Sequence, residues 1–152
     1  GQPKNLHLGQ KLKANGKSYQ VHSVNSGVPH AVLLTTQLEK ADLRALGATI
    51  RHHKAFKPAG TNVNLMKIES PHRIAIRTFE RGVEGETLAC GTGAAASALV
   101  AAALKGFRSP ITVLTKGGER LKISFRAKDG LFEEVFLEGR VSRVFEGSIK
   151  DV

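Results

Sequence analysis

The sequence predicts a single α+β domain in which an antiparallel sheet curves into a partial barrel around a central apolar helix. Three observations support this fold class. The chain has 152 residues, a length typical of one domain. Residues 94–104 are almost all small or apolar, as expected of a helix buried on most sides. Short segments of strand-like pattern, separated by turn residues, occur before and after that helix.

The part of the chain before the apolar helix contains several strand patterns and one further helix pattern. Four segments are alternating or continuously apolar and are short enough for strands: residues 17–24, 31–34, 62–68 and 73–80. Leu43, Leu46 and Ile50 fall at helical spacing, which predicts one short amphipathic helix.

The part of the chain after the apolar helix is predicted to be a β meander. The helix should end at Lys105 and Gly106, which combine a C-terminal cation with a capping glycine. Four strands are then expected at residues 111–115, 121–125, 132–137 and 141–145. Because the turns between them are short, these strands should be antiparallel neighbours. We divide the chain into a domain over residues 1–140 and a tail over residues 141–152.

Charge and composition restrict the function classes. Lys and Arg outnumber Asp and Glu by 23 to 13, and a net charge of +10 would suit nucleic acid, anionic lipid or an acidic small molecule. The basic residues are spread along the chain, and there is no aromatic-rich recognition strand, which argues against nucleic acid. No apolar run reaches 18 residues, which argues against a membrane role.

Cysteine and histidine usage predicts neither a disulfide nor a metal site. The chain has one Cys, so it forms no internal disulfide, and its six His lack the spacing of a metal cage. This pattern favours a reducing, cytoplasmic location.

The most informative residue is Cys90, which directly precedes Gly91-Thr92-Gly93 at the start of the apolar helix. Unpaired N–H groups and the helix dipole favour negative charge there, so we expect the thiol pKa to fall below its usual value of about 8.5. A thiolate would be available as a base or nucleophile. The alternative is that Cys90 is a small buried apolar residue and that the glycines allow close packing.

A second reading of the same segment is a dinucleotide fingerprint. Gly91, Gly93 and Ala96 match a loose G-x-G-x-x-A pattern. That fingerprint requires a hydrophobic strand directly before it within a βαβ unit, whereas residues 81–89 form a charged loop. We therefore reject nucleotide binding.

Six sequence blocks resemble the C-terminal half of the diaminopimelate epimerase family, whose members consist of two similar halves that face each other across a cleft. The blocks are Gly1-Gln2-Pro3, residues 25–30 (NSGVPH), residues 61–64 (TNVN), residues 80–82 (ERG), residues 86–94 (ETLACGTGA) and residues 144–147 (VFEG). The resemblance covers most of the chain and implies the domain fold of that family.

The resemblance implies inversion of an amino-acid α-carbon by two thiols on opposite faces, without pyridoxal phosphate, metal or other cofactor. The substrate would be LL- or meso-diaminopimelate, an intermediate of lysine and peptidoglycan synthesis in a bacterial cytoplasm. The implied catalytic residues are Cys90, Glu80 and His30. The implied substrate-binding residues are Asn62 and Arg81 at the distal end and the amides of Gly91 and Thr92 at the α-carboxylate.

Some of these roles have structural alternatives. Glu80 and Arg81 end a strand, where a charged pair is commonly a solvated edge. Asn62 could hold a turn, and His30 could be a loop histidine with satisfied hydrogen bonds.

Two departures from the family pattern shape the expected function. Val28 replaces the asparagine that is common in the GxPH motif, and the chain has no second Cys. We therefore expect one half of an active site, a piece of a longer enzyme that is inactive alone. Its expected partners are an amino-acid substrate, the N-terminal half, across which the tail would return, and a second copy in a homodimer. The alternatives are a proline racemase-like or phenazine-synthesis isomerase-like protein, or a non-catalytic basic binding domain of the same fold.

Overall fold

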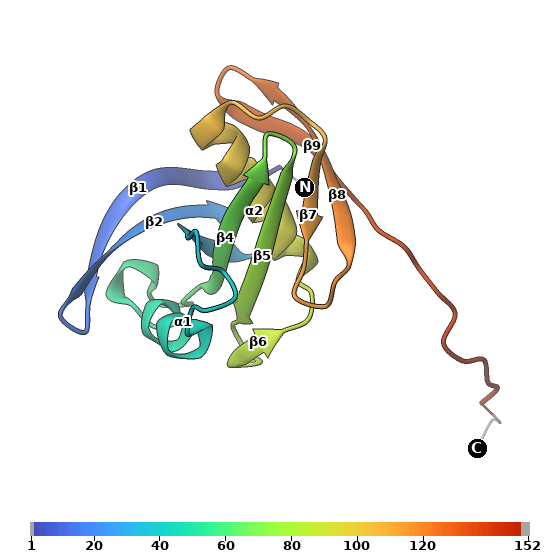
Figure 1. Cartoon of the computed structure of the whole chain (residues 1–152), viewed down its shortest axis with the longest axis horizontal. Helices are drawn as coiled ribbons and strands as arrows, with labels where there is room; N and C mark the ends of the chain where they lie inside the picture. Colours follow the sequence, from blue (N-terminus) through green and yellow to red (C-terminus); the bar gives the residue numbers. More distant parts are fainter. Residues whose placement is uncertain (1, 150–152) are drawn as a thin grey trace.

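The computed structural model describes residues 2–149, in which nine strands form one sheet (Figure 1). The strands are β1 (Lys4–Ala14), β2 (Lys17–Asn25), β3 (Pro29–Leu34), β4 (Asn62–Ser70), β5 (Arg73–Glu80), β6 (Gly85–Thr87), β7 (Ile111–Leu114), β8 (Arg120–Lys128) and β9 (Leu131–Glu138). The α-helices are α1 (Leu43–Arg51) and α2 (Gly91–Lys105), and a short 3-10 turn, η1 (Lys54–Phe56), follows α1. The α+β class predicted from the sequence is therefore confirmed.

The sheet is mixed and open, which corrects the prediction of an antiparallel partial barrel. Its strand order is β1-β2-β3-β4-β5-β7-β8-β9, with β6 paired to β5. The β3–β4 and β5–β7 pairs are parallel. Each of these pairs is joined by a crossover that contains a helix, α1 in the first and α2 in the second, and such a connection returns the chain in the same direction. The sheet is not closed into a barrel, and a barrel around α2 is not confirmed.

The two helices pack on opposite faces of the sheet. Side chains that alternate along a strand point to opposite faces, and the two apolar clusters divide the strands in this way. Val32, Ile74 and Ile76 belong to the cluster of α2. Ala31 and Ala75, their neighbours in the chain, belong to the cluster of α1. The sheet is thus the middle layer of three.

Helix α2 is apolar around most of its circumference. It begins at Gly91, three residues earlier than predicted, with Cys90 as its N-cap residue. Residues 93–102 are all buried. The predicted end at Lys105 is confirmed, and Gly106 takes the left-handed conformation as the C-cap.

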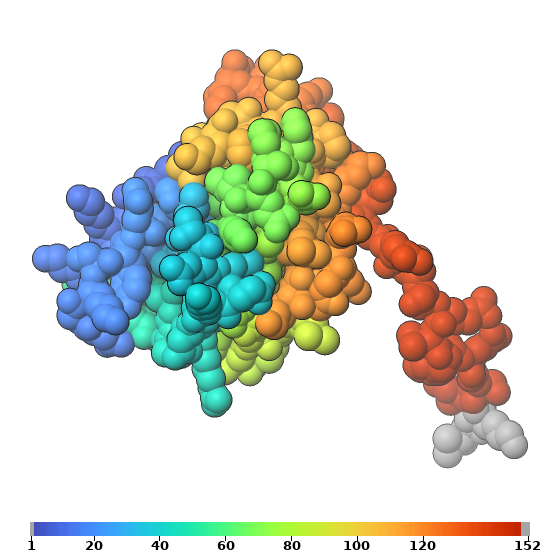
Figure 2. All heavy atoms as spheres, in the orientation of Figure 1, coloured from blue at the N-terminus to red at the C-terminus, as the bar shows by residue number. Residues whose placement is uncertain are grey.

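Two strands and the tail differ from the sequence prediction. Strands β1 and β6 were not predicted; β1 is a polar edge strand with two register shifts, and β6 has only three residues. Residues 141–145, predicted as a strand, pair with no strand in the part of the chain that the structure describes. Instead the tail extends away from the body, and its Val141, Val144 and Phe145 side chains are exposed (Figure 2). Among residues 2–149, no helix is long and apolar enough to span a membrane.

Candidate active site

Cys90 lies at the point where α2 meets the sheet. Its backbone is extended (φ −138°, ψ 108°), and its side chain caps no backbone N–H of the helix. The thiol is free, and the residue is only 8% exposed. Two groups of the first helical turn contact the sulfur. Thr92 Oγ1 is 3.6 Å from Cys90 Sγ, and the nearby backbone N–H of Gly93 lowers the pKa of the thiol.

The structure corrects the predicted direction of the Cys90 pKa. Burial is the largest influence, and it raises the thiol pKa because a thiolate is poorly solvated in an apolar surrounding. The Thr92 hydroxyl and the Gly93 N–H lower the pKa, while the charge of Glu80 raises it further. The net result is a raised pKa. The sequence prediction was wrong because it rested on the helix amides and gave too little weight to burial.

Gly93 leaves the space that this arrangement needs. A Cβ atom added at Gly93 would lie 2.5 Å from Asn64 Oδ1 and 3.3 Å from Cys90 Sγ. No side chain fits there without displacing one of these two groups. The glycine therefore allows α2 to approach β4 closely enough for Cys90 and Asn64 to belong to one cluster.

A buried chain of hydrogen bonds leads from Cys90 into the sheet. Thr92 Oγ1 is 2.9 Å from His30 Nε2 on β3. On the other side of the ring, Asn64 Nδ2 is 2.9 Å from His30 Nδ1, and Asn64 Oδ1 accepts from Thr78 Oγ1 at 2.9 Å. His30, Asn64 and Thr78 are all buried. The strands β3, β4 and β5 thus each supply one residue of this buried hydrogen-bonded chain.

His30 is neutral at physiological pH. Burial is the main cause that lowers its pKa, the positive charge of Arg81 is the second, and together they lower it to about 3. His30 therefore acts as a neutral hydrogen-bond partner of Thr92 and not as a cation.

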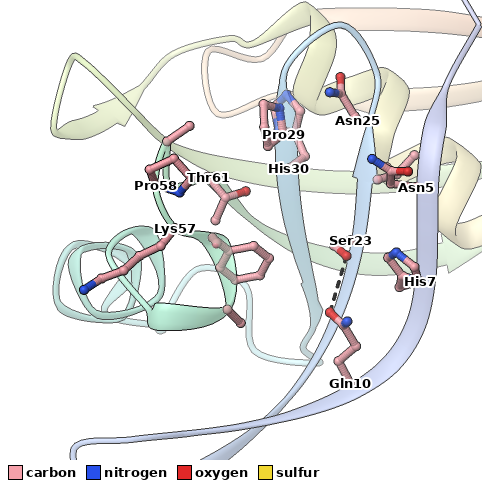
Figure 3. Close-up of a pocket in the computed structure, with 15 residues that line it drawn as sticks. Asn5, His7, Gln10, Ser23, Asn25, Pro29, His30, Lys57, Pro58 and Thr61 are labelled. Carbon is pink, nitrogen blue, oxygen red and sulfur yellow. Dashed lines mark hydrogen bonds between the residues drawn. The ribbon is translucent and has the colours of Figure 1, made fainter.

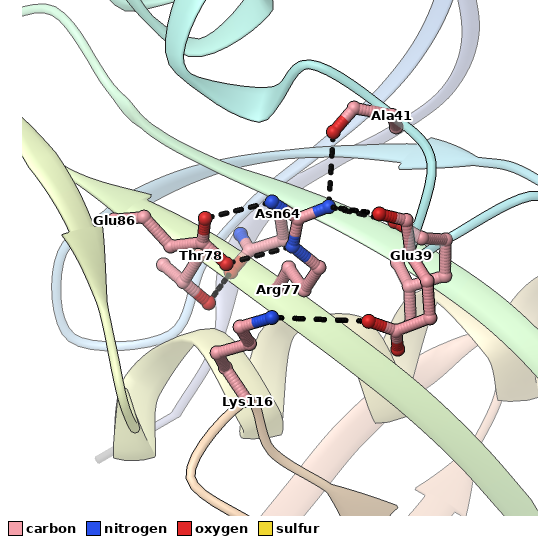
Figure 4. A network of polar contacts seen from close by, with 8 residues as sticks. Glu39, Ala41, Asn64, Arg77, Thr78, Glu86 and Lys116 are labelled. Atoms are coloured by element: carbon pink, nitrogen blue, oxygen red, sulfur yellow. Dashed lines mark hydrogen bonds and ion pairs between the residues drawn. The ribbon is translucent and has the colours of Figure 1, made fainter.

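Glu80 and the strand β6 form the opposite side of the cluster. Thr87 Oγ1 donates to Glu80 Oε1 at 2.5 Å, and β6 pairs with the end of β5. The position of β6 is fixed by Arg77, whose guanidinium makes two 2.7 Å bonds to Glu86 (Figure 4). Arg77 Nη1 also donates to the Leu38 and Ala41 carbonyls. This network anchors the segment that orients Glu80.

Asn62 holds the ends of three strands together. Its Oδ1 accepts from the Arg81 backbone N–H at 2.7 Å, and its Nδ2 donates to the Pro29 carbonyl at 3.2 Å. The Arg81 guanidinium donates to the Ala59 carbonyl at 3.3 Å. Both polar atoms of the Asn62 amide thus form hydrogen bonds within the chain, and these bonds fix the position of the side chain without a ligand.

A cavity of about 390 Å³ adjoins the cluster (Figure 3). Polar side chains from β1 and β2 form one wall, η1 and the segment after it form the other, and Pro29 and His30 lie between them. Cys90, Glu80 and Arg81 do not line this cavity. It therefore extends beside His30 and away from the thiol.

The residues proposed from the sequence gather where β3 and β4 begin, β5 ends and α2 starts. Cys90, Thr92 and His30 share one hydrogen-bonded chain, and Glu80 lies close enough to act on the thiol. Arg81 acts on His30 through its charge and contacts Asn62 through its backbone. Gly91 follows Cys90 as the first residue of α2.

Three further residues of the cluster were not predicted as site residues from the sequence: Asn64, Thr78 and Thr87. Asn64 lies on the same strand as Asn62, two residues later, and so points to the same face of the sheet. Two amides at that spacing within an otherwise apolar strand were the available signal. Thr87 lies in the block of residues 86–94, but no role was assigned to it, and Thr78 carried no signal because threonine is ordinary in strands.

Comparisons with known proteins agree on one family. Residues 22–144 match the family model described as Diaminopimelate epimerase. A curated diaminopimelate epimerase from Aquifex aeolicus (strain VF5) is 49% identical over 130 residues, which is 84% of this chain and 45% of the relative. One from Chlorobaculum tepidum is 43% identical over 87% of this chain and 51% of the relative. The chain spans about half the length of the curated relatives it matches.

A solved structure supports the fold over nearly the whole chain. The crystal structure titled as a probable proline racemase from Agrobacterium radiobacter K84 aligns with 91% of this chain and 48% of its own chain, with a TM-score of 0.62. The two sequences are 15% identical. At that identity the likeness describes the fold alone.

Proposed function

Because this chain belongs to the diaminopimelate epimerase family, we propose that it forms the C-terminal half of an epimerase active site, with Cys90 as one of two acid–base thiols. The observation that carries the proposal is the cluster around Cys90. The thiol is buried at the start of α2, Thr92 Oγ1 lies 3.6 Å from its sulfur, Glu80 raises its pKa, and His30 is joined to it through Thr92. The substrate class is the diaminopimelate stereoisomers, LL and meso.

The raised pKa of Cys90 suits a proton donor. At neutral pH the group is mainly a thiol, so it can deliver a proton to the α-carbon of a substrate bound in front of α2. The resulting thiolate is then held by the Thr92 hydroxyl and the Gly93 N–H. In the reverse direction the same thiolate removes the proton. Glu80 opposes the thiolate by its charge and so favours the return of the proton.

The first turn of α2 supports binding of the α-carboxylate. The first N–H groups of an α-helix have no acceptor within the helix, and the helix dipole favours an anion there. We assign the N–H groups of Gly91 and Thr92 to the carboxylate and to the enediolate charge that develops when the α-proton leaves. Arg81 is assigned to the distal carboxylate, with Asn62 fixing its backbone.

The second thiol is assigned to a partner, the N-terminal half of the same enzyme. Inversion needs a proton donor on the face opposite the base, and the chain contains one Cys. We divide the chain at residue 140. Residues 1–140 form the domain, and residues 141–152 are assigned to contact the partner half. The exposed Val141, Val144 and Phe145 support this contact, because apolar side chains of this size favour burial.

The test joins this chain behind the N-terminal half of a relative and measures conversion of the LL isomer to the meso isomer. We expect turnover from the joined protein and none from the chain alone. Cys90→Ala should lower turnover by about 10²- to 10⁴-fold, as is typical of a lost acid–base group, with a smaller effect on substrate binding. Turnover that survives this substitution, or epimerisation by the chain alone, would refute the assignment of Cys90.

A further inference from the structure

The hydrogen bonds around His30 define which of its ring nitrogens carries the proton. An amide nitrogen only donates, so the 2.9 Å contact between Asn64 Nδ2 and His30 Nδ1 requires Nδ1 to be the acceptor. A neutral imidazole has one proton, which must then be on Nε2. That proton points to Thr92 Oγ1, 2.9 Å away.

The contact with the Ala31 carbonyl fixes the orientation of the Asn64 amide, because a carbonyl only accepts, whereas the Thr78 hydroxyl can both donate and accept. Nδ2 donates to the Ala31 carbonyl at 3.2 Å, and the reversed amide would place two oxygens against each other there. On the other side, Oδ1 accepts from Thr78 Oγ1 at 2.9 Å. Asn64 is fully buried, so water does not compete for these bonds.

The direction of the next hydrogen bond follows from this tautomer. Because the His30 Nε2–H donates to Thr92 Oγ1, the Thr92 hydroxyl keeps its own proton for another acceptor. Cys90 Sγ lies 3.6 Å from that oxygen. The Thr92 hydroxyl therefore donates to the sulfur, and this bond strengthens when the sulfur is a thiolate.

We propose that Asn64 is a positioning residue that locks His30 as the Nε2–H tautomer and thereby turns the Thr92 hydroxyl toward Cys90. The inference rests on the proposed role of Cys90 for its catalytic meaning, but the tautomer and the hydrogen bond can be measured without turnover. Two charged groups act on this hydrogen-bonded chain. Glu80, at the end of β5, acts on the thiol, and Arg81 acts on His30.

The first measurement uses the unaltered chain. Two-bond nitrogen–proton NMR correlation distinguishes the two histidine tautomers, and the His30 signal is identified by its absence in His30→Gln. We expect His30 to be the Nε2–H tautomer at neutral pH. A proton on Nδ1, or on both nitrogens, would overturn the proposal without the use of any Asn64 variant.

The second measurement follows alkylation of Cys90 against pH, which is unambiguous because the chain has one thiol. Thr92→Val removes the donor, and we expect the midpoint to rise by about one pH unit. The conservative Thr92→Ser keeps the hydroxyl and should leave the midpoint near that of the unaltered chain. An unchanged midpoint in Thr92→Val would show that the hydroxyl does not donate to the thiolate.

Asn64→Asp tests the lock itself. An ionised carboxylate only accepts, so the ring proton should move to Nδ1, and the Thr92 hydroxyl should turn to Nε2 and away from the thiol. The new charge also raises the Cys90 pKa directly, and a double-mutant cycle with Thr92→Val separates the two effects. We expect Asn64→Asp to shift the alkylation midpoint by about one pH unit less in the Thr92→Val background. Equal shifts in both backgrounds would mean that Asn64 does not act through Thr92.

Failure of the tautomer proposal and failure of the proposed epimerase function give different results. An Nε2–H tautomer and a Thr92-dependent midpoint, together with an inactive joined protein, would refute the epimerase assignment alone. An active joined protein whose His30 carries its proton on Nδ1 would refute the lock alone.

Discussion

At the residue scale, Gly93 and Asn64 depend on each other. The helix can approach β4 only because Gly93 has no Cβ, and the approach places Asn64 Oδ1 where that Cβ would be. The close contact is therefore part of the site and not only of the packing. We therefore expect substitution of Gly93 to be tolerated much less than substitution of Gly91.

Gly93→Ala should lower the free energy of unfolding by about 1–3 kcal/mol, because the added methyl group forces Asn64 or α2 to move. Gly91→Ala is the matched control. Its Cβ would lie 3.2 Å from Cδ1 of Leu137, the end of a flexible and exposed side chain. We expect little change for that control in urea denaturation. Equal losses for both variants would contradict the close approach at Gly93.

His30 makes the stability of the fold depend on pH. An unfolded histidine binds its proton near pH 6.5, whereas the folded His30 binds it only near its lowered pKa of about 3. Between these pH values the unfolded chain binds more protons than the folded chain. The contribution of neutral His30 to stability is therefore complete above pH 6.5 and is lost as the pH falls toward 3.

The slope from this one group should approach about 1.4 kcal/mol per pH unit within that window. We expect His30→Gln to flatten the fall in the free energy of unfolding between pH 6 and pH 4, which denaturant titration measures. A parallel profile for His30→Gln and the unaltered chain would show that His30 is protonated in the folded state.

At the scale of elements, the short strand β6 depends on an ion pair whose arginine, Arg77, is buried. Arg77 and Glu86 bond in a bidentate geometry, and Arg77 also anchors the segment between β3 and α1 through the Leu38 and Ala41 carbonyls. Removal of the carboxylate would leave a buried guanidinium with carbonyl partners only. Since β6 carries Thr87, the effect should extend to Glu80.

Glu86→Gln should lower the free energy of unfolding by about 1–3 kcal/mol, because a buried cation loses its counter-charge. The Arg126–Glu133 pair on the neighbouring strands has the same 2.7 Å distance, but its arginine is exposed. We therefore expect Glu133→Gln to leave the denaturation midpoint unchanged. Equal losses for both substitutions would contradict the prediction that burial of the arginine makes the Arg77–Glu86 pair more important for stability.

The elements show where sequence reasoning succeeds. The interior strands and both helices were predicted, because burial imposes a clear apolar pattern on residues such as Val63, Ile74 and Leu99. The edge strand β1 has little to bury, so its pattern is weak. The parallel pairings were missed because strand direction depends on the crossovers, which a pattern of single segments does not contain.

The same reasoning applies to the candidate site. Cys90 and its glycines could be found from chemistry, and Glu80, Arg81, Asn62 and His30 from resemblance. The spacing of Asn62 and Asn64 places two amides on one face of a strand, but the role of Asn64 could not be assigned, because it depends on a three-dimensional contact with His30 from another strand. The direction of the Cys90 pKa shift could not be predicted either, because it is set by burial, which is a property of the folded chain.

At the scale of the whole molecule, residues 141–149 extend away from the folded body. Residues 141–149 have no strand partners in the described chain, and their apolar side chains are exposed. The tail therefore adds little to the stability of the domain, but it offers apolar surface to another chain.

Removal of residues 141–152 should leave the melting temperature within about 2 °C of the full chain, because few contacts are lost. The full chain should self-associate in sedimentation experiments as its concentration rises, and the shortened chain should not. Val144→Ser combined with Phe145→Ser keeps the tail length and should behave as the shortened chain does. A monomer at all concentrations for the full chain would contradict this expectation, and a large loss of thermal stability would show that the tail packs on the domain.

The parallel pairing of β5 with β7 has a consequence for the order of events during folding. A parallel pair cannot form as a local hairpin, so its strands meet only after the intervening chain, with α2, has been laid across the sheet. Contacts between distant segments form slowly, because the entropy of closing the loop is lost before the contacts form. The hairpin of β1 and β2 can form early, whereas the thiol is covered only when α2 docks. The surroundings of Cys90 are therefore among the last parts of the molecule to take shape.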